Sequence, residues 1–171
     1  MRIPMLAFLL AVPLFAESAA GLKWTAPAGW KNEGSRPMRA ATYDIAPAAG
    51  DKDAPECAVY FFGAGRGGSV EANVERWKNQ ILAPDGKPAG ANIQKRTIHG
   101  FAVTTIDSSG AYTGMGGPMA KSNTNQPGYR LLGAIVEGPG GNLFIKLTGP
   151  SKTIEANQKK FEQLLDSFQK E

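Results

Sequence analysis

The stretch 56–82 constrains the fold more than any other part of this sequence, because it places an apolar strand directly before a glycine loop and an amphipathic helix. Side chains alternate between the two faces of a strand, and the run 57–62 is apolar at every position. A strand with one wet face would alternate with polar residues. We therefore expect this strand to be covered on both faces, as central strands are.

The helix that follows is predicted from its start signal and its spacing. Ser69 is a residue type that caps helix N-termini well. Val74, Trp77 and Ile81 recur at helical spacing and define the face that packs on a sheet. Pro84 ends the pattern, because proline cannot continue the helical hydrogen bonds. On this interpretation Trp77 is a buried structural residue.

The N-terminus has the features of a secretory signal peptide. Arg2 precedes an apolar run at 3–15, and the small residues 18–20 fit a cleavage site. The run is shorter than the roughly 20 apolar residues that a membrane span needs. We predict a signal peptide over 1–20 and one domain over 21–171, exported to the periplasm or the cell exterior and without a transmembrane span.

Charge and single-copy residues exclude several classes of function. The net charge is +4, and the basic residues are dispersed with no run longer than a pair, so no nucleic-acid groove is indicated. Cys57 is the only cysteine, which rules out an internal disulfide. His99 is the only histidine, which rules out a metal site built on a histidine pair.

Two further motifs resemble ligand sites and are interpreted as structural. Residues 63–68 match G-x-G-x-x-G, but the next predicted strand ends in a hairpin turn, where a dinucleotide fold would need a parallel strand. A flexible connector is the favoured interpretation, and no cofactor is predicted. Asp51, Asp53 and Glu56 lack the rest of a calcium-binding loop, so we interpret them as solvated acidic residues.

The rest of the chain reads as strands followed by one more helix. The segments 92–98 and 101–109 flank His99-Gly100, a two-residue hairpin signal. The segments 129–137 and 143–148 form a second apolar pair, and an apolar stripe predicts a helix that begins near 151–153. Helices and strands both need cover, so the expected fold is α+β, an antiparallel sheet flanked by helices on both faces.

Three segments resemble one known family. They are WTAPAGW at 24–30, NVERWKNQ at 73–80 and FIKLTGP at 144–150. Together they are similar to PsbP-like proteins, which are α/β/α sandwiches, and the resemblance covers nearly all of the expected mature chain. It implies a non-enzymatic accessory or binding domain of the cell envelope. Photosystem members of that superfamily help to retain ions at a manganese cluster, and no residue here supports transferring that role.

A candidate binding surface lies on the first helix. Asn73, Arg76 and Gln80 are spaced so that they share one face with Trp77. They can form a recognition patch, or they can satisfy the backbone of neighbouring loops at the margin of the core. The second interpretation is favoured, because buried polar side chains most often bind backbone groups.

The segment 110–128 supplies the other candidate residues. It is long and glycine-rich, and loops of this length without their own structure are usually functional or disordered. It also carries Tyr112, Met115 and Met119, side chains that suit adaptable contacts. Either the loop binds a partner or it is a disordered insertion.

The sequence therefore predicts an exported, non-enzymatic binding or accessory domain with a protein or small-molecule partner in the cell envelope. The alternative is a secreted hydrolase whose site forms under the 110–128 loop. Converging carboxylates in a deep cavity would favour the hydrolase.

Overall fold

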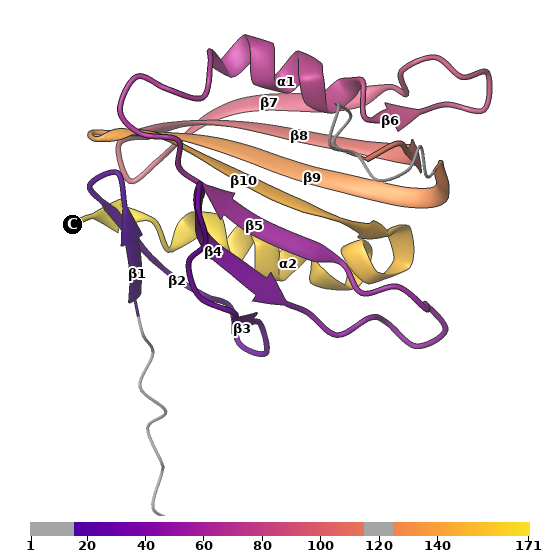
Figure 1. Ribbon diagram of the computed structural model, residues 1–171, viewed down its shortest axis with the longest axis horizontal. Coiled ribbons are helices and arrows are strands. Elements are labelled where there is room, and N and C mark those ends of the chain that lie inside the picture. Colours follow the sequence, from indigo (N-terminus) through magenta and orange to yellow (C-terminus); the bar gives the residue numbers. More distant parts are fainter. Residues whose placement is uncertain (1–15, 115–124) are drawn as a thin grey trace, which may run out of the picture.

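The computed structural model describes residues 16–114 and 125–171 (Figure 1). Its strands are β1 (Ala16–Ala19), β2 (Leu22–Thr25), β3 (Lys31–Asn32), β4 (Arg39–Asp44), β5 (Glu56–Tyr60), β6 (Ile81–Leu82), β7 (Ala91–Ile98), β8 (Phe101–Tyr112), β9 (Gln126–Gly138), β10 (Gly141–Pro150) and β11 (Gln169–Lys170), and its helices are α1 (Val70–Lys78) and α2 (Ser151–Asp166).

Two antiparallel sheets organise the described chain. The larger has eight strands in the order β3-β4-β5-β10-β9-β8-β6, with β7 pairing alongside on β8. The smaller has three strands in the order β1-β2-β11, so it joins the two ends of the described chain. Neither helix in the described residues has the length and apolarity needed to cross a bilayer.

The predicted sheet flanked by helices on both faces is wrong. Strand makes up 48% of the structure and helix 17%, with only two helices in the described part of the chain. The nine-residue α1 is too short to form a layer, and the described residues leave part of the sheet face on its side uncovered. It ends at Lys78 because the next apolar residue, Ile81, leaves the helix and pairs with Tyr112 as part of β6.

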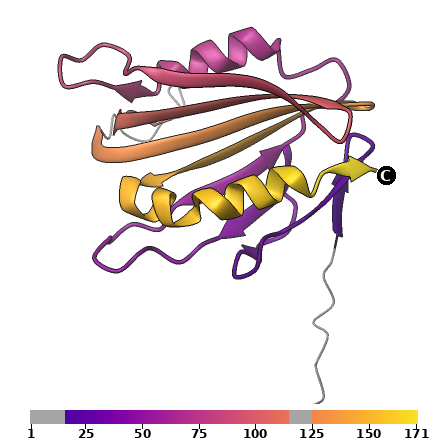
Figure 2. The same cartoon turned by 180° about the vertical axis from the view of Figure 1, so that it is seen from behind.

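The main core lies on the side of the large sheet that carries α2. Seen from behind, α2 runs across this face (Figure 2). Phe161, Leu164 and Leu165 of α2 are fully buried in one cluster with side chains of β4, β5, β9 and β10. Trp24 and Phe168 close this core at the small sheet, with ring centroids 5.2 Å apart.

A smaller core forms where α1 meets the sheet. Ser69 caps the helix by accepting a hydrogen bond from the Ala72 amide at 3.1 Å. Trp77 is 3% exposed and belongs to the cluster formed with β8, β9 and β10. Its ring occupies the space above Gly133, where an added Cβ would lie 2.6 Å from Trp77 Cε3. Gly133 therefore sets how closely the helix approaches the sheet.

Turns predicted from the sequence are also present, with one change in extent. His99 and Gly100 form the β7–β8 turn with φ of 47° and 87°. The loop predicted over 110–128 is shorter in the structure, because β8 and β9 continue into this segment and Tyr112 pairs with Gln126.

Trp77→Ala is expected to lower the free energy of unfolding by roughly 3–5 kcal/mol, because it empties the contact between α1 and the sheet. Gly133→Ala should also destabilise, by roughly 1–3 kcal/mol, because the new methyl group overlaps the indole. Chemical denaturation measures both. Met38→Ala, at a residue that is 64% exposed, is the control with little expected change. A near-zero effect at Trp77 would contradict the packing described here.

Candidate functional site

The uncovered part of the α1 face carries an unusual set of side chains. Paired residues of adjacent antiparallel strands point to the same face. The register of β5 with β10 pairs Glu56 with Thr148, Ala58 with Lys146 and Tyr60 with Phe144, so all six side chains share this face.

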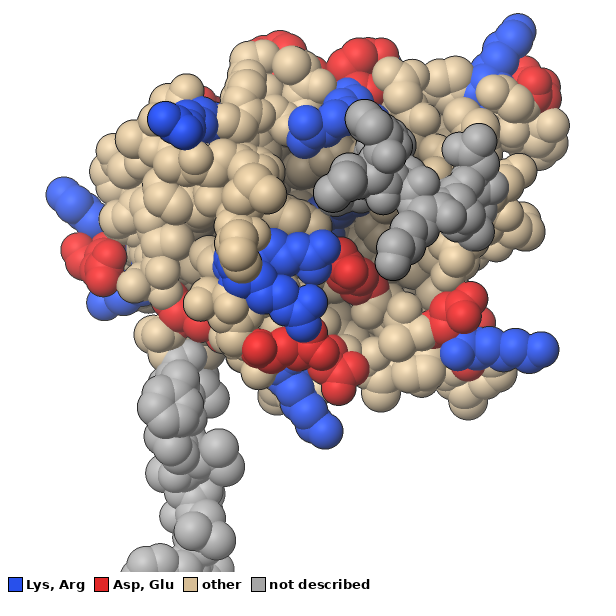
Figure 3. Space-filling model, in the orientation of Figure 1, with Lys and Arg blue, Asp and Glu red and all other residues tan. Residues whose placement is uncertain are grey.

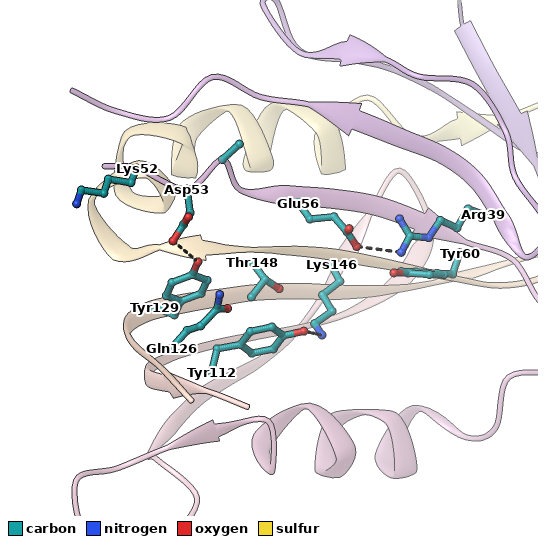
Figure 4. Close-up of a pocket in the computed structure, with 11 residues that line it drawn as sticks. Arg39, Lys52, Asp53, Glu56, Tyr60, Tyr112, Gln126, Tyr129, Lys146 and Thr148 are labelled. Atoms are coloured by element: carbon teal, nitrogen blue, oxygen red, sulfur yellow. Dashed lines mark hydrogen bonds and ion pairs between the residues drawn. The ribbon is translucent and has the colours of Figure 1, made fainter. Parts of the chain in front are cut away.

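Two adjacent cavities occupy this uncovered face, and we call them together the cleft. The larger measures about 560 Å³ and the smaller about 300 Å³, and both are lined by Tyr60 and Lys146. Figure 3 shows the hollow, with basic and acidic side chains beside it, and Figure 4 shows the lining of the larger cavity. The larger cavity is lined also by Arg39, Lys52, Asp53, Ala54, Glu56, Tyr112, Gln126, Tyr129 and Thr148, and the smaller by Phe62, Arg76, Trp77, Gln80 and Phe144.

Lys146 lies at the centre of the cleft and is almost fully buried. The residue is 6% exposed. Its Nζ donates to Gln80 Oε1 at 2.5 Å and to the Tyr112 hydroxyl at 3.0 Å. Gln80 follows α1 and Tyr112 ends β8, so the amine is held by elements that meet only in the folded chain.

No carboxylate neutralises this amine. Every Asp and Glu of the sequence lies within residues 16–114 and 125–171, and none of the ion pairs there includes Lys146. Buried lysines are normally paired, because a buried charge without a partner is costly. An unpaired lysine facing a cavity is therefore a candidate for binding an anion.

The surroundings of Lys146 oppose its protonation. The pKa of Lys146 is lowered to about 7, mainly by burial; the nearby Glu56 carboxylate opposes this shift, and Arg76 and Arg39 add to it. Burial also raises the pKa of Tyr112 to about 12, so its hydroxyl keeps its proton at neutral pH. The cleft thus places an amine that can change charge near neutrality beside a phenol that does not ionise there.

Arg76 brings a second cation to the smaller cavity. Its guanidinium donates to Asn73 Oδ1 at 2.5 Å, and no carboxylate of the described chain forms an ion pair with it. Asn73 is buried and its amide donates to the carbonyls of Gly67 and Ser69 at 2.7 and 2.8 Å. Asn73 therefore links the glycine-rich connector at 63–68 to α1 and holds the Arg76 guanidinium in position.

Three charged residues that line the larger cavity are engaged with side chains of the same cavity. Arg39 pairs with Glu56 at 3.0 Å and lies over the Tyr60 ring at 5.1 Å. Asp53 accepts a hydrogen bond from the Tyr129 hydroxyl at 3.2 Å. No three His, Cys, Asp or Glu side chains of the described chain gather as a metal site would require.

Thr148 adds an unused polar group to the same face. Its Oγ1 is buried and has no hydrogen-bond partner within the described residues. Thr148 lies two residues after Lys146 on β10, so both side chains face the larger cavity (Figure 4). A buried hydroxyl without a partner costs stability, and a bound ligand would supply the missing contact.

The structure brings together three of the six residues predicted from the sequence as a binding surface. Arg76, Gln80 and Tyr112 line the cleft, whereas Asn73 lies beneath Arg76 and binds loop backbone. The remaining two, Met115 and Met119, fall outside the described residues.

Sequence reasoning missed the central residue of the site. Lys146 stands in the run 143–147, which is otherwise apolar. A lysine inside a strand that is buried on both faces was the signal that could have identified it. Arg39, Tyr60 and Tyr129 carried no comparable signal, because they reach the cleft only through the strand pairing.

Replacing the buried amine is expected to stabilise the protein in acid. Lys146→Met should raise the free energy of unfolding by roughly 2 kcal/mol at pH 6. The variant no longer buries a charge, which stabilises it, but it leaves Gln80 and Tyr112 without their hydrogen-bond partner, which removes part of that gain. The pKa of Lys146 falls from 10.5 to about 7 on folding, so between these values the unfolded chain binds more protons. The stability of the unmodified protein should therefore rise with pH from about 7 to 10.

Denaturation of both proteins across this pH range measures the effect, with Lys95→Met as the control, since the Lys95 side chain is 73% exposed. If Lys146→Met kept the same rise with pH, the buried amine would not be its source.

Comparison with known proteins gives the fold a context. No protein-family model matches the sequence, and no curated protein is significantly similar to it. Among solved structures, the chain is similar to cyanobacterial PsbP (CyanoP) from Synechocystis sp. PCC 6803, with 13% identity, a TM-score of 0.57 and coverage of 99% of both chains. It is also similar to PA94, a protein of unknown function from Pseudomonas aeruginosa, with 10% identity, a TM-score of 0.50 and coverage of 90% of this chain and 94% of the other. These identities establish a likeness of fold alone, and the expected resemblance is confirmed at that level: the chain has a PsbP-like fold.

Proposed function

We propose that this protein is an exported, non-enzymatic binding domain whose cleft takes a small organic anion. The observation that carries the proposal is the buried Lys146 amine, which faces the cleft and has no carboxylate partner. Burying such a group lowers stability, and no ion pair compensates for it. Destabilising features of this kind are characteristic of functional sites.

The shape and lining of the cleft support a small molecule as ligand. Both cavities fall within the size range of ligand sites, roughly 300–1,000 Å³. Lys146 and Arg76 provide two cations without carboxylate partners, and the smaller cavity surrounds them with aromatic rings. A ligand with an acidic group and a flat apolar body would satisfy both features. The aromatic residues concerned are Tyr60, Phe62, Trp77 and Phe144.

The alternative of a hydrolase under the 110–128 loop has no comparable support. The two carboxylates that line the larger cavity are each engaged elsewhere, Glu56 with Arg39 and Asp53 with Tyr129. They do not form the converging pair that would favour acid–base catalysis. Binding without turnover is the simpler role for this arrangement.

Benzoate is a suitable first probe, because it combines a carboxylate with an aromatic ring. We expect isothermal titration calorimetry to detect binding that tightens as the pH falls. If the carboxylate binds only the protonated amine, affinity should be about 30-fold higher at pH 6 than at pH 8.5 for a pKa of Lys146 near 7.

Lys146→Met should remove both the binding and its pH dependence, and Arg76→Met should weaken binding at every pH. Lys95→Met is the matched control and should change neither. Binding of benzoate that survives Lys146→Met unaltered would contradict the assignment of the cleft.

The site of signal-peptide cleavage also stays a proposal. We expect N-terminal sequencing of the exported protein to begin at Gly21. Such a cut removes β1, which pairs with β2 and whose Glu17 accepts a hydrogen bond from the Tyr43 hydroxyl. The mature protein would then keep a two-stranded β2–β11 ribbon. An exported protein that began at Met1 would contradict the signal peptide. One that began at Glu17 would contradict the predicted cleavage site while retaining β1 except for Ala16.

A further inference from the structure

We propose that Lys146 also captures carbonyl compounds, forming a reversible imine with an aromatic aldehyde bound in the cleft. The inference rests on the proposed binding site and deepens it, because it names a ligand class and a chemical step. It starts from geometry: a lysine amine is oriented by two side chains, faces a cavity and forms no ion pair with a carboxylate.

The step balances without any further reactant. The neutral amine of Lys146 attacks the aldehyde carbon and forms a C–N bond, giving a carbinolamine. The first N–H proton passes to the carbonyl oxygen, which becomes the carbinolamine hydroxyl. That hydroxyl takes a proton from the Tyr112 hydroxyl and leaves as water, while the second N–H proton passes to the Tyr112 oxygen and the nitrogen forms the C=N bond. The products are one imine and one water, and water reverses the reaction. Lysine amines react in this way when a desolvated site leaves them unprotonated.

The two partners of Lys146 have separate roles in this step. The Gln80 side-chain oxygen lies 2.5 Å from Nζ and fixes the direction in which the nitrogen lone pair points. The Tyr112 hydroxyl lies 3.0 Å from Nζ, within reach of an oxygen bonded to the carbon that Nζ attacks. Its position lets it donate a proton to that oxygen as it leaves, and because burial raises the pKa of Tyr112 to about 12 the hydroxyl is still protonated at pH 7.

The lining of the smaller cavity selects the class of aldehyde. Tyr60 and Phe62 stack with centroids 6.0 Å apart, and Phe62 meets Phe144 at 5.5 Å. Such a wall favours a flat aromatic body over an aliphatic chain. Arg76 lies in the same cavity as Lys146, so an acidic substituent on the ring would find a cation while the aldehyde meets the amine.

Labelling with 4-carboxybenzaldehyde tests the proposal. The folded protein is incubated with the aldehyde at pH 7 in the presence of sodium cyanoborohydride, which reduces an imine to a stable secondary amine. Peptide mass spectrometry then gives the labelling rate of each lysine. Ordinary exposed lysines are almost fully protonated at this pH, so Lys146 should be modified at least 10-fold faster than Lys95.

Three variants separate the chemistry from simple binding. Lys146→Met should abolish the fast site and Lys95→Met should leave it unchanged. Tyr112→Phe keeps the ring but removes the hydroxyl, so it should slow labelling of Lys146 by about 10-fold or more. Terephthalate, which has no aldehyde, should compete with the probe and slow the labelling.

Each outcome has a distinct meaning. Labelling of Lys146 no faster than Lys95 overturns the imine proposal, and if benzoate still binds in the same cleft, the proposed function stands without it. Loss of both benzoate binding and selective labelling overturns both. Circular dichroism of each variant shows that it is folded, so a failed label cannot be attributed to unfolding.

Discussion

The buried amine of Lys146 is the constraint around which the site is arranged. Water is largely excluded from it, it forms no ion pair with a carboxylate, and its hydrogen-bond partners in the described part of the chain are Gln80 and the Tyr112 hydroxyl. A charged amine in such a place is costly, which is why its pKa falls to about 7. The protein therefore keeps an ionisable group where an apolar one would be more stable. Keeping this group is an advantage only if a ligand that enters the cleft interacts with the amine.

The cleft exists because α1 covers only part of its sheet face. Gly133 on β9 pairs with Lys146 on β10 and lies beneath Trp77, so the helix packs closely beside the lysine and shields it on one side. Had the helix continued through Ile81, it would have extended further across the sheet. Instead Ile81 joins β6, and the turn between them places Gln80 against the amine. The short α1, the close approach at Gly133 and the Gln80–Lys146 hydrogen bond together form one side of the cleft.

Local patterns in the sequence predicted local structure well. An uninterrupted apolar run identified β5 as a central strand, the His99-Gly100 pair marked the β7–β8 hairpin, and helical spacing placed Trp77 in a core. Helix spacing and the Tyr112 side chain also drew attention to residues that line the proposed cleft, although for the helix residues the sequence favoured contacts to loop backbone. The extent of helix cover was mispredicted, because the spacing of Ile81 fits a helix and a strand equally and only its pairing with β8 decides. Lys146 was missed for a related reason. Its neighbours in the cleft come from β5, β8 and the segment that follows α1. No single segment of the sequence shows which strands pair, so these neighbours could not be predicted.

The same amine that lowers stability can couple binding to pH. An anion placed beside Lys146 favours the charged form, so binding raises the pKa of the amine and draws a proton from solution. The energetic cost of burial is then offset by the ligand rather than by a built-in carboxylate. A permanent Asp or Glu at this position would have stabilised the empty protein, but it would also have occupied the cation and repelled an acidic ligand. Under the proposed function, three features share one explanation: the lack of an ion pair at Lys146, the unpartnered Thr148 hydroxyl and the sheet face that the described residues leave uncovered are all completed by the bound anion.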